Sequence, residues 1–257
     1  MVLALLTAVG CAKKDGRREL ELGRAAMESR ELSKARDFFS KSLKYAPGSV
    51  DALVGLAQCS LALGDIDAAG KAMTEALALR PGDVDVRLLD AEVAWHRKDY
   101  GKAKRVFREV AQDASLEPQV RSQGWSSLGV VEFAEGNLDL ARIAFLRAVR
   151  IDRRNAAAWY HLGLLYRDYG YSHAALEQFE IYVRISDEAS ARVQKVLRTV
   201  IPDLKDSIAR EAADRPGASR RDSSAAPPPS PRRKRHGRKA RSNARSSCIR
   251  KRSRPMF

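Results

Sequence analysis

The sequence predicts an all-α protein, an α-solenoid of about five helix-turn-helix repeats, and three observations lead to this prediction. Ala, Leu, Arg, Glu and Lys, the residues that favour helix, are abundant among the 257 residues. Apolar side chains recur at spacings of three and four, as on one face of a helix, and not at every second position as in a strand. Matching residues also recur every 34 residues along most of the chain.

The two clearest copies of the repeat contain Trp125 and Trp159. The matched pairs, each 34 residues apart, are Trp125 and Trp159, Leu128 and Leu162, Gly129 and Gly163, Ala141 and Ala175, Phe145 and Phe179, and Ala148 and Tyr182. A Gly inside a helix costs roughly 1 kcal/mol relative to Ala. Gly163 is therefore expected where a neighbouring helix comes too close to admit a side chain.

The remaining copies match more weakly but stay in register. The five predicted copies cover residues 16–49, 50–83, 84–121, 122–155 and 156–189. The third copy has Arg87 and Asp90 in the places of the Trp and the Leu, and four residues are inserted around 111–118. Each copy is predicted to form two helices separated by a turn. Gly64, Gly136 and Gly170 suit such turns because Gly readily adopts the left-handed conformation that ends a helix.

This pattern resembles the tetratricopeptide repeat, a 34-residue helix pair with W-x2-L-G-x2-Y in its first helix and A-x3-F in its second. The resemblance covers about residues 16–189. It implies stacked helix pairs that share one continuous core, because a single pair cannot bury its apolar face alone.

Residues 189–213 are expected to form capping helices, broken near Pro202 because Pro interrupts the helical hydrogen bonds. Val193, Val196 and Ile201 belong to an apolar stripe with charged residues on the opposite side. Such a stripe is typical of a terminal helix that covers the exposed end of a solenoid.

Residues 214–257 differ sharply in composition from the rest of the chain. Of the 47 Lys and Arg residues, 15 follow Asp214, against one acidic residue there, so most of the net charge of +15 lies in this tail. A Pro/Ser-rich linker and a basic run are predicted to be disordered, because they contain too few apolar residues to form a core. The basic run would attract nucleic acid or anionic lipid weakly and without sequence preference, and its candidate residues are Arg232, Arg233, Lys234, Arg235, Arg238 and Lys239.

The first eleven residues resemble the signal of a bacterial lipoprotein, in which small residues precede a Cys that is lipidated after cleavage. An apolar run ends in Ala8-Val9-Gly10-Cys11. Two features depart from that pattern: Ala8 stands where Leu is usual, and no basic residue precedes the run. We interpret Cys11 as a candidate lipid attachment site, the alternative being a frayed apolar terminus or the first turn of a helix.

The sequence offers no catalytic residue, metal site or cofactor motif. The four histidines lack metal-binding spacing, and neither a Gly-rich phosphate loop nor a G-x-S-x-G elbow is present. Three scattered cysteines are too few for a disulfide framework. We therefore expect a protein that is not an enzyme.

In tetratricopeptide proteins, the first helix of each pair lines a concave groove that binds peptides or partner helices. Carried over by position, the resemblance implies a substantially apolar groove here. Its candidate residues are Leu20, Arg24, Val54, Gln58, Leu88, Glu92, Trp95, Val130, Phe133, Tyr160, Leu164 and Arg167.

Two functions follow as hypotheses. The first is a scaffold that holds a partner peptide or amphipathic helix in the groove, lipid-anchored in a bacterial cell envelope where it helps assemble or organise complexes. The alternative is a cytoplasmic adaptor whose basic tail binds nucleic acid or ribosomes.

Overall fold

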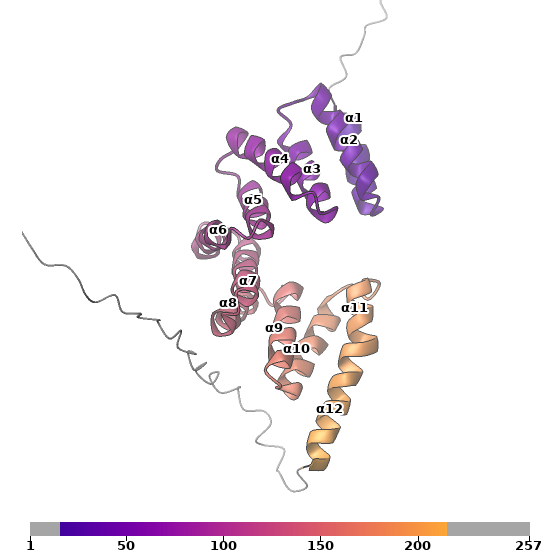
Figure 1. Ribbon diagram of the computed structural model, residues 1–257, viewed down its shortest axis with the longest axis vertical. Helices are drawn as coiled ribbons and strands as arrows, with labels where there is room; N and C mark the ends of the chain where they lie inside the picture. Colours follow the sequence, from indigo (N-terminus) through magenta and orange to yellow (C-terminus); the bar gives the residue numbers. More distant parts are fainter. Residues whose placement is uncertain (1–15, 215–257) are drawn as a thin grey trace, which may run out of the picture. The chain divides into compact units, whose positions relative to one another are not determined.

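The computed structural model describes residues 16–214, and every regular element in this part of the chain is a helix (Figure 1). The helices follow one another in consecutive packed pairs. The pairs are α1 (Arg17–Glu28) with α2 (Leu32–Tyr45), α3 (Val50–Ala62) with α4 (Ile66–Leu79), α5 (Val84–His96) with α6 (Tyr100–Gln112), α7 (Pro118–Ala134) with α8 (Leu138–Ile151), and α9 (Ala156–Asp168) with α10 (Ser172–Ile185). The chain is an all-α solenoid, as the sequence predicts.

Equivalent positions of the repeat form the core. In every pair, both the Ala of the A-x3-F motif and the large residue four positions later are buried. These are Ala35 and Phe39, Ala69 and Met73, Ala103 and Phe107, Ala141 and Phe145, and Ala175 and Phe179. The ring of Phe179 lies against Gly163, where an added Cβ would come within 2.8 Å of it. The expected close approach of the two helices at Gly163 is therefore confirmed.

The turns between paired helices use the left-handed conformation. Gly64, Gly136 and Gly170 adopt φ angles of 82°, 77° and 78°, as expected from the sequence. Arg30 and Lys98 occupy the same place in the first and third repeats with φ angles of 59° and 63°. These two residues hold a conformation that non-Gly residues rarely adopt.

The four inserted residues lengthen a helix. α7 has 17 residues, whereas the equivalent helix α5 has 13. The additional turn lies at the N-terminal end of α7, which starts at Pro118, where the missing N–H is not needed. The first helix of the fourth pair thus begins before residue 122, the start of the predicted copy.

The C-terminal segment is one continuous helical stretch, so the expected break near Pro202 is wrong. α11 (Ala191–Lys195) passes through a π-helical turn, η1 (Val196–Val200), into α12 (Ile201–Asp214). Pro202 lies in the first turn of α12, and the wider turn before it accommodates its ring and missing N–H. Val193, Val196, Ile201 and Leu204 are buried, and α12 packs on α10.

Two predicted features lie outside the described residues: the lipidation site at Cys11 and the basic tail from residue 215 onward. Within residues 16–214, no helix is both long and apolar enough to cross a membrane.

Candidate partner-binding groove

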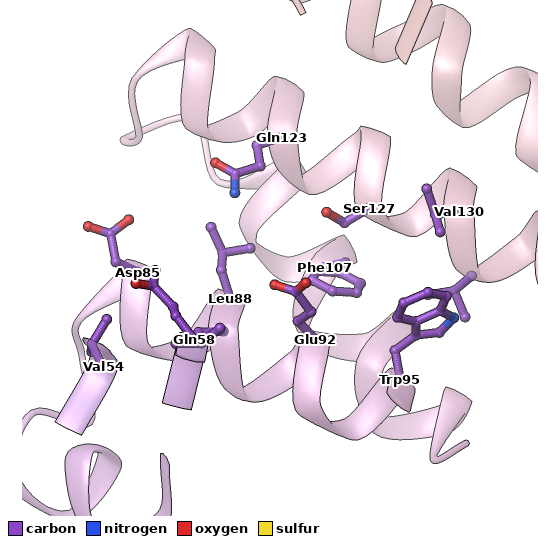
Figure 2. A pocket seen from close by; sticks show the side chains of 12 residues that line it. Val54, Gln58, Asp85, Leu88, Glu92, Trp95, Phe107, Gln123, Ser127 and Val130 are labelled. Atoms are coloured by element: carbon purple, nitrogen blue, oxygen red, sulfur yellow. The ribbon is translucent and has the colours of Figure 1, made fainter. Parts of the chain in front are cut away.

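A hollow of about 430 Å³ lies between α3, α5, α6 and α7 (Figure 2). Side chains of α5 and α7 face one another across it. The lining residues are Val54 and Gln58 of α3, Asp85, Leu88, Leu89, Glu92 and Trp95 of α5, Phe107 of α6, and Gln123, Ser127, Val130 and Val131 of α7.

The floor of this hollow is apolar. Leu88, Leu89, Phe107 and Val131 are buried and line the hollow. Trp95 is half-buried at one end, where its ring packs edge-on against His96 with centroids 4.6 Å apart. An apolar side chain of a partner would gain free energy by leaving water here, at roughly 25 cal/mol per Å² buried.

The rim carries negative charge. Asp85 and Glu92 are exposed, and within residues 16–214 neither carboxylate takes part in an ion pair or accepts a hydrogen bond. The nearby Asp90 differs, since it is buried and pairs with the Lys102 ammonium at 2.7 Å. Asp83 accepts from the backbone N–H groups of Asp85 and Val86 and so caps α5. The other polar side chains of the rim, Gln58, Gln123 and Ser127, are neutral.

A second hollow of about 350 Å³ shares Val54, Gln58 and Asp85 with the first. The Arg24 guanidinium lines it and is bound at 2.9 Å by Glu21 and at 2.9 Å by Asp51. Its charge is thus compensated within the chain. The groove therefore continues from α5 toward α1, with uncompensated charge concentrated beside α5.

The structure brings together six of the predicted groove residues in the first hollow, places Arg24 in the adjoining second hollow, and separates the other five. The six are Val54, Gln58, Leu88, Glu92, Trp95 and Val130. Leu20 packs on the N-terminal core cluster. Phe133 and Leu164 pack on the C-terminal one. Arg167 is bound to its neighbour Asp168 at 3.1 Å.

Tyr160 is half-buried and packs against side chains of its own chain. Its ring lies 5.2 Å from that of Tyr182 and 5.9 Å from that of Phe179, centroid to centroid. The Arg192 guanidinium from α11 lies over the ring at 5.3 Å. The C-terminal helical segment thus reaches the position where the last repeat would offer its groove.

His161 is packed beside this cluster. Its ring stacks on Phe145 with centroids 5.3 Å apart. Burial, and secondarily the positive charge of Arg192, lower the pKa of His161 to about 4. Its neighbours are rings and a guanidinium, which is a packing environment. Among residues 16–214, no group of three or more His, Cys, Asp or Glu side chains could hold a metal ion.

Three polar residues that line the hollow, Asp85, Gln123 and Ser127, are not among the groove residues predicted from the sequence. Asp85 lies one helical turn before Leu88, and the run 85, 88, 92 and 95 follows a single face of α5. Extending the predicted face by one turn toward the N-terminus would have found Asp85 in α5 and Gln123 in α7. Ser127 lies beside the predicted face of α7, and only the packing of α7 on α6 shows that its side chain lines the hollow.

Comparison with known proteins agrees with this architecture. Residues 20–84 and 60–122 match two family models, both described as tetratricopeptide repeat. A CTR9 homolog of Arabidopsis thaliana is 27% identical over 148 residues, which are 56% of this chain and 13% of that protein. Superkiller protein 3 of Saccharomyces cerevisiae is 29% identical over 126 residues, 49% of this chain and 8% of that protein. This chain thus spans only a small part of either relative.

Solved structures share the fold. A thermophilic tetratricopeptide protein of Thermus thermophilus has a TM-score of 0.62 at 16% identity, covering 76% of this chain and 99% of that one. The type IV pilus biogenesis factor PilW has a TM-score of 0.59 at 16% identity, covering 81% of this chain and 97% of that one. Pseudomonas aeruginosa pilF has a TM-score of 0.57 at 19% identity, covering 79% of this chain and 93% of that one. The repeated sequence pattern and the two family-model matches show that the chain contains tetratricopeptide repeats, and the solved structures share the fold of its paired helices.

Proposed function

We propose that this protein is a non-catalytic scaffold that holds an apolar, basic segment of a partner protein in the hollow between α3, α5 and α7. The observation that carries the proposal is an apolar floor beneath two uncompensated carboxylates, Asp85 and Glu92. The scaffold role itself is supported by the tetratricopeptide repeats, because their fold is that of a protein-interaction scaffold.

The chemistry of the hollow selects the partner. An aliphatic or aromatic side chain fits against Leu88, Trp95 and Val130, while a Lys or Arg nearby on the same segment faces Asp85 and Glu92. Gln58, Gln123 and Ser127 supply hydrogen-bonding groups for the backbone of an extended peptide or for the polar face of an amphipathic helix. An acidic segment would be repelled.

A peptide library displayed on phage and selected against the full chain tests this directly. The selected peptides are expected to combine an apolar residue with Lys or Arg close by. Binding of one synthetic selected peptide is then measured by fluorescence anisotropy. Asp85→Asn combined with Glu92→Gln is expected to weaken it about tenfold at low salt, and Val130→Glu to weaken it by at least that much, because it places a charge on the apolar wall.

The matched control is Glu177→Gln combined with Glu180→Gln, which removes two exposed carboxylates from α10 without touching the hollow. This variant should bind the peptide like the unmodified protein. Equal loss in the control and in the Asp85/Glu92 variant, or full binding by Val130→Glu, would show that the peptide binds elsewhere.

We also propose that the scaffold works in a bacterial cell envelope, where it organises a larger assembly and is anchored by a lipid on Cys11. The support is the Ala8-Val9-Gly10-Cys11 sequence; the likeness to PilW and pilF concerns the fold alone. Mass spectrometry of the protein purified from membranes of its native cells should find a lipid-modified Cys11 at the mature N-terminus. An unmodified Met1 on the mature protein would contradict the anchor.

A further inference from the structure

Four side chains of α5 follow one line along the groove. Asp85, Leu88, Glu92 and Trp95 all line the hollow, and acidic and apolar residues alternate in this order. The two carboxylates are seven residues apart, and so are the two apolar residues. Seven residues make two helical turns, or about 10.5 Å along the helix axis. Groups of the same kind therefore recur along α5 with that period.

The opposite wall, formed by α7, has the same period. Gln123 and Val130 line the hollow and are also seven residues apart. Figure 2 shows Gln123 at the end of the hollow where Asp85 lies, and Val130 at the end where Trp95 lies. α5 and α7 thus run in the same direction here, and both walls share one polar end and one apolar end.

A helical partner matches this period, whereas an extended partner does not. Along an extended peptide, side chains on one face recur about every 6.8 Å. Groups about 10.5 Å apart therefore fall between the first and the second such step. Along a helix, residues seven positions apart share one face and lie about 10.5 Å apart. A helix laid along α5 can thus face both carboxylates and both apolar residues at once with a regular backbone.

The C-terminal part of this chain makes a contact of this kind at the equivalent place of the last repeat. The repeat puts Tyr160 of α9 where α5 has Leu88. The Arg192 guanidinium of α11 lies over the Tyr160 ring at 5.3 Å, and the next residue, Val193, is fully buried. A helical segment with adjacent basic and apolar residues therefore partly covers one groove position within the chain itself.

We propose that the partner segment is an α-helix that lies antiparallel to α5, an inference that rests on the proposed function. Reading from its N-terminus, this helix presents an apolar residue to Trp95 and, three positions later, a basic residue to Glu92. A second apolar residue, four positions further on, faces Leu88, and a second basic residue, three positions after that, faces Asp85. The antiparallel direction is favoured because the negative C-terminal end of the partner helix then lies beside the positive N-terminal ends of α5 and α7.

Synthetic fluorescent peptides test the helix. The first is an Ala-rich peptide with Leu, Lys, Leu and Lys at the intervals just given. The second has the same composition but places these four residues at every second position, as in a strand. The third is the first peptide with a Pro between its first Lys and its second Leu. In fluorescence anisotropy with the full chain, the first should bind about tenfold more tightly than the other two or better, because Pro interrupts a helix and the strand spacing places the four side chains on different faces. Equal affinity of the first and third peptides would show an extended partner and overturn the proposal.

Exchange of charges tests the direction. Asp85→Lys should weaken binding of the first peptide about tenfold at low salt. Glu in place of the second Lys of the peptide should restore binding, and Glu in place of the first Lys should not. Glu92→Lys is the matched variant, and its binding should be restored by Glu at the first Lys only. Both carboxylates are exposed, so both variants should fold normally. The opposite pattern of restoration would mean a parallel helix and overturn the proposed direction.

Failure of this inference is distinguishable from failure of the proposed function. If a phage-selected peptide depends on Asp85 and Glu92 but tolerates Pro in its centre, the groove holds a partner and the helix is wrong. If no selected peptide responds to Asp85→Asn combined with Glu92→Gln, the hollow is not the binding site, and the proposed function falls together with the helix.

Discussion

At the scale of single residues, a glycine in the first helix of three of the repeats, at Gly23, Gly129 and Gly163, determines how close the paired helices come. Gly163 lies against the ring of Phe179, and Gly129 has the same relation to Phe145. In an open helix, replacing Gly by Ala would add roughly 1 kcal/mol of stability. Here the added methyl group would collide with a ring that the surrounding core holds in place.

Gly163→Ala is therefore expected to destabilise the protein by roughly 1–3 kcal/mol, because the added Cβ would lie 2.8 Å from Phe179 ring carbons. Denaturant unfolding followed by circular dichroism measures the change. Gly82→Ala is the control, since nothing lies within 4 Å of its added Cβ, and it should leave stability nearly unchanged. A Gly163→Ala protein as stable as the control would mean that the helices separate without cost.

His161 makes stability depend on pH. Its pKa of about 4 in the folded protein lies below the ordinary 6.5, first because of burial and then because of Arg192. Between these two values the unfolded chain binds a proton at this site and the folded chain does not. Stability is thus fully present above pH 6.5 and falls as the pH drops from 6.5 toward 4.

The contribution of His161 is isolated by His161→Gln, which cannot titrate. From about pH 7 to about pH 4.5, the unmodified protein should lose on the order of 1–3 kcal/mol more stability than the variant. Chemical unfolding at a series of pH values gives both curves. Parallel curves would show that the imidazole is hydrated in the folded state.

At the scale of elements, two of the turns between paired helices are strained. Lys98 holds a φ of 63° where the neighbouring repeat has Gly64 at 82°. Lys98→Gly should therefore stabilise the protein by roughly 0.5–1 kcal/mol, seen as a rise in the melting temperature. The reciprocal change Gly64→Ala should lower stability by about 1 kcal/mol. An unchanged or lower melting temperature for Lys98→Gly would argue that the left-handed turn costs Lys nothing.

The C-terminal segment acts as a cap through one face only. Val196 of η1 is 1% exposed, whereas its neighbour Leu197 is 37% exposed. Val196→Ala should cost roughly 1–2 kcal/mol by leaving a cavity beside α10. Leu197→Ala should cost clearly less, although it removes more atoms. Thermal unfolding of the two variants compares them, and a reversed order would mean that the segment packs by its other face.

At the scale of the whole molecule, the repeats do not contribute equally to stability. Among the described residues, the N-terminal buried cluster contains only Ala35 and Phe39 of α2 with Ala52 and Cys59 of α3, whereas the cluster around α7 and α8 extends from α5 to α12. In a solenoid each repeat is stabilised only by its neighbours. Backbone amides of α1 should thus exchange with solvent through openings of lower free energy than those of α7 and α8. Hydrogen-exchange mass spectrometry measures this, and uniform protection would indicate a single cooperative unit.

The sequence by itself determined the fold, because the 34-residue recurrence and the helical spacing are local patterns that need no knowledge of distant contacts. It also placed the glycine turns and the close contact at Gly163, since both follow from the conformational freedom of Gly. The groove positions Val54, Leu88 and Val130 came from the resemblance to the family, and the structure places all three beside one hollow.

Only the tertiary structure decided which groove positions lie together and which are covered. Asp85 belongs to the hollow because α7 lies opposite α5, and Tyr160 is partly covered because Arg192 reaches it from α11. The continuous helix through Pro202 also depended on packing, since burial of Val196 and Leu204 favours one straight segment over a break. Contacts between residues far apart in the chain determine these features, and a periodic pattern in a single sequence carries no record of them.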